Sequence, residues 1–470
     1  MLLTAIIIYI LITVGIGAWS SKLIKNSNDF VLAGRQLPLF LSASALFATW
    51  FGSETIFGAS SEYLDHGLQG VIEDPFGGAL CLILFGVFYL KPMYRMNVLT
   101  IGDVYKNIFG KRVEFFASVF MVPVYFGYVA AQLVALALIF SSVSDLSISQ
   151  GIMISAGIVV FYTFLGGMWA ISITDFIQTT LIVVGLIWVA VLVAEKAGGI
   201  TPILVSAPEG SFQFLPKAEP IAWLNYLGAW IILGLGSIPS QDIYQRVMAS
   251  KSEKVAVRST YLAGTFYVTI GLLPLFIALG ARYLYPEIYL ENKQLLLSEM
   301  VLRHSSIHVQ ILFFGALISA IMSTTSSGLL APSAIVSENL IRPYFGKRLK
   351  DKHFLWILRI NIICVAAVAT IMAQWKTNIY ELVAGASILM LVSLFVPLTA
   401  GLYWKRASEM GAIMSIVFGM IAYLGLSSLD LPFYPHLPAV LISAIAMIMG
   451  SIIFPVKTKQ HVTLPKNKAS

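Results

Sequence analysis

Runs of about 20 mainly apolar residues recur along the whole chain, and no other feature limits the fold as strongly. Each run is long enough to cross the hydrocarbon core of a bilayer as a helix. Charged residues make up only 11% of the chain, whereas a soluble domain carries about 25%. The sequence therefore predicts an all-α membrane protein, and the connections between runs are too short for a separate soluble domain.

We expect thirteen spans, at residues 2–20, 38–60, 70–90, 114–140, 149–168, 172–195, 221–245, 256–284, 307–338, 354–373, 378–403, 409–427 and 436–455. Most of the 30 Lys and Arg residues fall in alternate connections, and Arg246 is counted among them. Such an excess marks the cytoplasmic side. The pattern predicts a multi-pass protein of the plasma (inner) membrane, with the N-terminus outside and the C-terminus cytoplasmic. The net charge of +7 then reflects topology and not nucleic-acid binding.

Residues 39–61 are long enough to span, yet their middle reads Trp50-Phe51-Gly52-Ser53-Glu54-Thr55. An ionisable group inside a membrane is costly and is retained mainly for function. One interpretation is a kinked helix whose Glu54 finds a partner inside the bundle. The other is a helix broken at residues 51–53, whose freed carbonyls and half-helix ends form an ion and solute site.

A second interruption supports the broken helix. Gly234, Gly236 and Pro239 interrupt residues 221–245 at about the same depth as Gly52 interrupts its own run. The two runs are five spans apart, so they enter the membrane from opposite sides. Matched interruptions in oppositely oriented halves indicate an inverted-repeat transporter.

The sequence thus predicts one membrane transporter domain over residues 1–470, with a core of five plus five helices. We assign a peripheral first helix and inner loop to residues 1–37, and the two five-helix repeats to residues 38–195 and 221–403. Residues 404–456 form two accessory helices, and residues 457–470 form a cytoplasmic tail. One helix precedes the core and two follow it.

Hydroxyl side chains gather in residues 307–338. Ser323 and Thr324 follow Ala320 by three and four residues and share its helix face, and Ser326 with Ser327 continue that face one turn later. Hydroxyls also serve as ordinary contacts between membrane helices. The doubled pair is better explained as oxygen ligands for a hard cation, which prefers oxygen donors.

Several motifs resemble the sodium:solute symporter family, which shares the inverted-repeat fold of the leucine transporter. They are NDFVLAGRQLP, ATWFGSETIFGAS, GGMWAISITDFIQ, SIPSQDIYQRVMAS and AIMSTTSSGLLAPSAIVSENL, in that order. The stretch DPFGGALCLILFGVFYLKPM and the TWFG motif are most similar to the choline-transporter-like branch. The resemblance extends from about residue 28 to residue 406 and implies a sodium coupling ion with no organic cofactor.

The resemblance also implies site residues. The first sodium would be held by the carbonyls of Ala48, Phe51 and Ala320 and by the hydroxyls of Ser323 and Thr324. A second sodium would take Ser326, Ser327 and Asp175, although Asp175 could instead complement a helix dipole. The solute pocket would include Trp50, Glu54, Thr55, Asp74, Tyr128, Ser237, Ser240 and Gln241.

Choline carriers enclose the quaternary ammonium with aromatic faces, but they have a tryptophan where this chain has Ser240. The solute therefore stays open among an amine, an amino acid, a carboxylate and a sugar. For Asp74, a structural role at a helix N-terminus is an equal alternative.

The predicted function is sodium-coupled import of a small organic solute by alternating access, with the bilayer, sodium and the solute as the only partners required and a monomer sufficient. Proton coupling through Glu54 and Asp175 on the same fold is the alternative. An enzyme is excluded because no HExxH, GxSxG or P-loop motif is present.

Overall fold

A computed structural model describes all residues except 292, 346–349, 376–377 and 456–470. Throughout the described part the regular structure is helical, apart from a single bridge between Leu37 and Ser250. Ten helices there are long and apolar enough to cross a membrane, or up to 11 if a bent pair is counted as one span. The protein is therefore an all-α, multi-pass membrane protein.

The helices around the centre are α3 (Leu39–Trp50), α4 (Ala59–Gly70), α9 (Val124–Val143), α10 (Ile148–Lys196), α12 (Pro220–Gly236), α13 (Gln241–Ala249), α14 (Glu253–Leu284), α17 (Ile307–Ile335) and α20 (Ile379–Met390). The others are α1 (Leu2–Ser20), α2 (Ser27–Leu32), α5 (Gly78–Leu84), α6 (Leu90–Met96), α7 (Ile101–Phe109), α8 (Lys111–Met121), α11 (Ile200–Val205), α15 (Pro286–Glu291), α16 (Leu296–His304), α18 (Arg342–Phe345), α19 (Asp351–Trp375), α21 (Val396–Tyr403), α22 (Glu409–Leu426) and α23 (His436–Ile453).

The expected count of thirteen spans is not reached, for two reasons. The runs expected at 149–168 and 172–195 both lie in α10 and are counted once, but two helices meet there: the backbone leaves the helical region at Gly167, with φ 49° and ψ −150°, and the Tyr162 hydroxyl contacts that of Thr174 across this point. The run expected at 38–60 is divided, because α3 ends after 12 residues. The hydrophobic runs thus located the apolar segments, and the count differs where a turn at Gly167 or the break after Trp50 interrupts a helix.

Both predicted interruptions are present. The first follows Trp50: Phe51 has φ −76° and ψ 76°, and a π-helical turn, Glu54–Gly58, leads into α4. The second separates α12 from α13, which are bent by 48° relative to each other. Pro239 lies in this gap, where a missing N–H costs no helical hydrogen bond. Each break places peptide groups inside the bundle without partners from a continuous helix.

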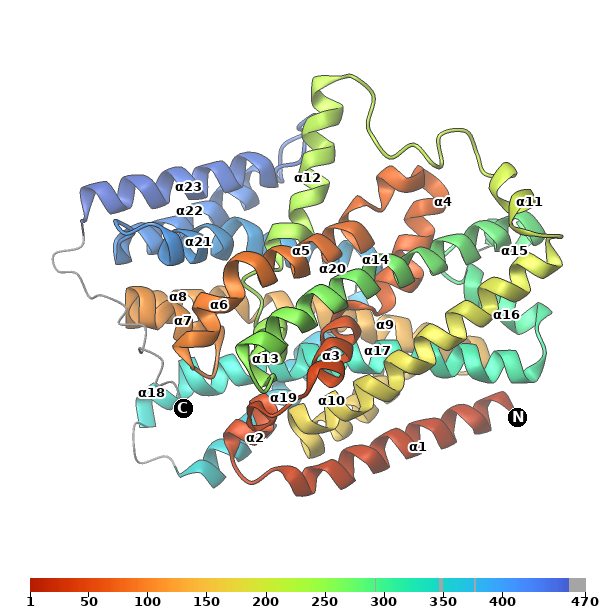
Figure 1. Ribbon diagram of the computed structural model, residues 1–470, viewed down its shortest axis with the longest axis horizontal. Coiled ribbons are helices and arrows are strands. Elements are labelled where there is room, and N and C mark those ends of the chain that lie inside the picture. The colour runs from red at the N-terminus through yellow and green to blue at the C-terminus, as the bar shows by residue number, and fades with distance from the viewer. Residues whose placement is uncertain (292, 346–349, 376–377, 456–470) are drawn as a thin grey trace.

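Helix α17 forms the buried centre against which these breaks are positioned. Every residue from 316 to 335 is buried, whereas α1, along one edge of the molecule, exposes Leu3, Ile7, Ile8 and Leu11 (Figure 1). Figure 1 also shows α22 and α23 side by side at another edge, away from α3 and α17. The hydroxyls of α17 therefore contact protein and not lipid.

Candidate ion and solute site

The end of α3 meets α17 through the first hydroxyl pair. Ser323 Oγ lies 3.0 Å and Thr324 Oγ1 3.2 Å from the Ala48 carbonyl oxygen. Thr324 Oγ1 also lies 3.0 Å from the Ala320 carbonyl. Four of the five residues expected to hold the first sodium are thus in mutual contact, and all four are buried.

The break itself lies against Thr324. A Cβ added to Gly52 would come within 2.7 Å of Thr324 Oγ1 and 2.9 Å of Gln132 Oε1. Only glycine therefore lets the backbone approach the hydroxyl this closely. Phe51, the fifth expected ligand, lies beside it at the break, where its ring stacks on Phe47 at 4.6 Å. A role for the Phe51 carbonyl stays a prediction.

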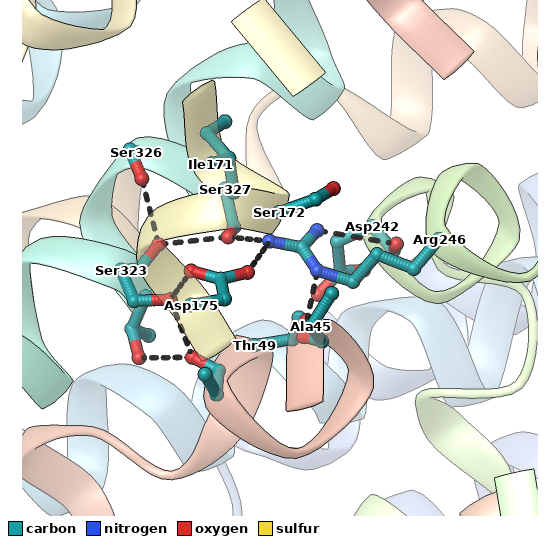
Figure 2. A network of polar contacts seen from close by, with 12 residues as sticks. Ala45, Thr49, Ile171, Ser172, Asp175, Asp242, Arg246, Ser323, Ser326 and Ser327 are labelled. Atoms are coloured by element: carbon teal, nitrogen blue, oxygen red, sulfur yellow. Dashed lines mark hydrogen bonds and ion pairs between the residues drawn. The ribbon is translucent and has the colours of Figure 1, made fainter. Parts of the chain in front are cut away.

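The second hydroxyl pair has a different environment. Ser326 Oγ and Ser327 Oγ both donate to the Ser323 carbonyl, at 2.9 and 2.7 Å. Asp175 accepts from Ser323 Oγ at 2.5 Å through Oδ1, while its Oδ2 lies 3.7 Å from Arg246 Nη2. The same guanidinium donates to Ser327 Oγ, as Figure 2 shows. A cation therefore already lies among the residues expected to bind a second sodium.

Arg246 does not lie in a cytoplasmic connection as the sequence predicted. Its side chain is only 1% exposed, and its Nε donates to the Ala45 carbonyl at 2.9 Å. The prediction was wrong because the broken span continues inside the bundle as α13, which is buried as far as Ala249, so the chain reaches the connection only after Arg246. The i+4 step from Asp242 to Arg246 was the sequence signal that both residues share one face of a helix.

A small cavity lies beside the first site. It is lined by Trp50, Val124, Tyr125, Tyr128, Ser237, Ser240, Asp242, Ala386, Ser387 and Met390. Four of the residues expected to contact solute are among them, from α3, α9 and the break between α12 and α13. Its volume of about 20 Å³ holds roughly one water molecule, so a solute can bind only when these walls separate.

Asp242, the acidic residue of this cavity, was not among the site residues predicted from the sequence. It is 2% exposed, accepts from Trp50 Nε1 at 2.8 Å through Oδ2, and accepts from the Tyr125 hydroxyl at 3.0 Å through Oδ1. Tyr125 Oη in turn accepts from the backbone N–H of Gln241 and Asp242, at 2.8 and 3.2 Å. The aromatic residues and the carboxylate therefore form one connected wall.

The other expected solute residues lie outside the cavity lining. Thr55 Oγ1 donates to Asp74 Oδ2 at 2.6 Å, and Tyr267 Oη donates to Asp74 Oδ1 at 2.6 Å. Glu54 Oε2 accepts from Gln132 Nε2 at 2.7 Å. These contacts tie the segment after the break to α9 and α14, and the binding of solute by Glu54, Thr55 and Asp74 stays a prediction.

The Gln241 side chain is also absent from the cavity lining. Its Oε1 accepts from the backbone N–H of Ile101 at 2.7 Å, at the start of α7. Tyr125 and Gln132 were visible in the sequence as part of a polar run in one apolar segment, but nothing there distinguished them from packing residues. The lining residue Ser387 and the hydrogen-bonding Tyr267 carried no such signal, because their contacts depend on how distant helices pack.

Two interrupted helices around buried hydroxyls, peptide carbonyls and an acid-bearing cavity define a membrane transporter. The chain belongs to the sodium:solute symporter family, whose family model matches residues 30–419. This is a family of transporters and not of enzymes. The chain is 28% identical over 440 residues to the mouse high affinity choline transporter 1, and the match covers 89% of this chain and 75% of that protein. It is 25% identical to the Escherichia coli sodium/proline symporter, covering 95% and 91% of the two chains.

Solved structures agree on the fold. A substrate-bound, outward-open structure of a Na⁺-coupled sialic acid symporter superposes with a TM-score of 0.84 at 19% identity, covering 97% of this chain and 98% of that chain. The transporter Mhp1 in a closed conformation superposes with a TM-score of 0.61 at 18% identity, covering 92% and 97%. The protein therefore has the leucine-transporter-type fold.

Proposed function

We propose that this protein imports a small organic solute together with sodium by alternating access, across a plasma (inner) membrane with its N-terminus outside. The proposal includes thirteen spans, counting the two parts of α10 as two spans and the divided α3–α4 run as one. Ten of them form a core of five plus five inverted helices. A monomer suffices for transport in this scheme.

One observation carries the proposal: the hydroxyls of Ser323 and Thr324 converge on the Ala48 carbonyl where α3 ends. A hard cation prefers such oxygen donors, and the end of an interrupted helix supplies carbonyls. Sodium at this position would join the break to α17, favour one arrangement of the cavity walls and raise solute affinity. By linkage, the solute would raise sodium affinity by the same factor.

The test replaces both hydroxyls, Ser323→Ala with Thr324→Ala. We expect the purified wild-type protein to melt at a higher temperature in sodium than in potassium at equal ionic strength and pH, and the double variant to lose this difference. In proteoliposomes, solute uptake should require an inward sodium gradient only in the wild type. Uptake at equal rate without that gradient would refute the proposal.

Thr325→Ala is the matched control. Thr325 is a fully buried neighbour on α17, but its hydroxyl donates to the Ile321 carbonyl of its own helix. We expect this variant to keep the sodium response, because the substitution leaves the Ala48 carbonyl and its two hydroxyl partners in place.

Proton coupling on the same fold is the second candidate. It would use Glu54 and Asp175: Glu54 Oε1 and Asp175 Oδ2 are buried and have no hydrogen-bond partner in the described part of the chain, so protons could neutralise them. Replacing sodium by potassium at fixed pH separates the two mechanisms, since proton-coupled uptake would be unchanged and sodium-coupled uptake would stop.

A further inference from the structure

The Asp242 carboxylate lacks a charged partner. None of the described Lys, Arg or His side chains forms an ion pair with it, and its only side-chain partners are the neutral Trp50 and Tyr125. Arg246, on the same helix, directs its guanidinium to Asp175, Ser327 and the Ala45 carbonyl, and its contact with Asp242 is at 3.5 Å to the backbone carbonyl and not to the carboxylate. A buried charge without a counter-charge is costly, and the N-terminus of α13 offsets only part of this cost.

A second polar group in the same cavity is also unsatisfied. Ser240 is 1% exposed and lines the cavity, and its Oγ has no hydrogen-bond partner among the described residues. The nearby hydroxyls of Ser237 and Ser387 lie 3.3 Å apart. Hydroxyl oxygens accept hydrogen bonds, and each carboxylate oxygen of Asp242 can accept more than the one that it receives. The cavity therefore offers several free acceptors.

The remaining walls select against a negative charge. No residue of the cavity lining is Lys, Arg or His, so a solute carboxylate placed here would meet Asp242 without a compensating cation. The faces of Trp50, Tyr125 and Tyr128 attract cations through the negative potential of their rings. The carboxylate and the aromatic rings thus both favour a positively charged ligand.

We propose that the solute is a small protonated amine, whose ammonium group pairs with Asp242 and donates N–H to the acceptors of this cavity. This inference rests on the proposed transport function and specifies its substrate class. An amine with an N–H should bind more tightly than its quaternary counterpart, whose nitrogen has no hydrogen to donate to Ser240 or to the spare carboxylate lone pairs. Amino acids and carboxylates should bind poorly.

The experiment measures binding to the purified full-length protein at saturating sodium, by the shift of melting temperature and by tryptophan fluorescence. The probes are ethanolamine, dimethylethanolamine, choline, proline, glycine betaine and acetate. We expect dimethylethanolamine to bind more tightly than choline, and the last three to cause no shift. In Asp242→Asn, amine affinity should fall about ten- to a hundredfold, since a charge-assisted contact is lost, and Asp242→Glu should recover part of it.

A control separates loss of the amine site from loss of the transport scheme. Sodium alone should stabilise Asp242→Asn as it does the wild type, because the Ser323–Thr324 pair is untouched. Unchanged amine affinity in Asp242→Asn, proline or acetate binding better than any amine, or the absence of any shift with the amines would overturn the inference. Choline binding as tightly as dimethylethanolamine would overturn the requirement for an N–H. Failure of sodium to stabilise the wild type would instead overturn the proposed function.

Discussion

Two hydroxyl pairs lie one turn apart on α17, and they meet opposite surroundings. Ser323 and Thr324 face the Ala48 carbonyl at the end of α3, and their other partners, the Asp175 carboxylate and the Ala320 carbonyl, are also oxygen acceptors. The second pair, Ser326 with Ser327, lies beside the Arg246 guanidinium, which donates to Ser327. The residue types and spacing are the same, but the first pair can accommodate an added cation, whereas the second pair already has one supplied by the protein.

This difference bears on sodium stoichiometry. Asp175 connects the two pairs, because Oδ1 accepts from Ser323 and Oδ2 faces Arg246 (Figure 2). A sodium ion among Asp175, Ser326 and Ser327 would have to displace the guanidinium or share the carboxylate with it. We therefore expect the first pair to dominate the sodium response.

The largest effect is expected from removing the resident cation with Arg246→Gln. Asp175 is fully buried, and breaking one side of a buried ion pair typically costs about 3–5 kcal/mol. In sodium-free buffer this variant should melt well below the wild type. Sodium should stabilise it more than the wild type, since the ion can then occupy the place beside Asp175 and the second hydroxyl pair.

Arg246→Lys serves as the comparison, because it keeps a positive charge while losing the planar, multi-donor geometry. It should lie between the wild type and Arg246→Gln in both stability and sodium response. Equal melting temperatures for all three proteins without sodium would mean that Arg246 does not neutralise Asp175.

An intermediate effect is expected from Gly52→Ala. The new Cβ would lie 2.7 Å from Thr324 Oγ1, so the hydroxyl or the break must shift. We expect the apparent sodium affinity to fall about tenfold, equivalent to the loss of roughly one hydrogen bond's free energy, with a smaller loss of stability. Titrating sodium against melting temperature measures the change.

Gly315→Ala is the control for that substitution. Gly315 lies on α17, the helix that carries Thr324, but an added Cβ there meets no atom within 4 Å. Its sodium titration should match that of the wild type. A sodium affinity in Gly52→Ala equal to that of this control would show that the close approach at the break is irrelevant to ion binding.

The sequence alone predicted the apolar segments, both helix breaks and the α17 hydroxyls, because each depends on local features: hydrophobic length, glycine and proline positions, and helical spacing. The broken helix was distinguishable from a simple kink only by the matching interruption near Pro239. The family resemblance then assigned Ala48, Ala320, Ser323 and Thr324, which the fold brings into contact.

The same reasoning could not place Arg246, because a basic residue near the end of an apolar run normally marks a loop. Its burial depends on α13 continuing inside the bundle, where Arg246 contacts α10 and α17, which are distant in sequence. Asp242 was missed for a related reason: its significance comes from Trp50 and Tyr125 on two other helices. Contacts across the bundle, not local pattern, determine the charge of each part of the site.

The smallest effect is expected from Ser326→Ala with Ser327→Ala, and it separates the two pairs most sharply. Both hydroxyls already donate to the Ser323 carbonyl of their own helix, so their removal should cost about 1 kcal/mol of stability each or less. Sodium affinity and the steepness of the sodium titration should stay within about twofold of the wild type, a difference of under 0.5 kcal/mol. A clear loss of sodium affinity or of steepness, comparable with that of the Ser323–Thr324 double variant, would mean that a second ion binds beside Arg246. Arg246 is present in the wild type and in the Ser326–Ser327 double variant. That outcome would therefore require the ion and the arginine to share Asp175, and the two pairs would then act as one site.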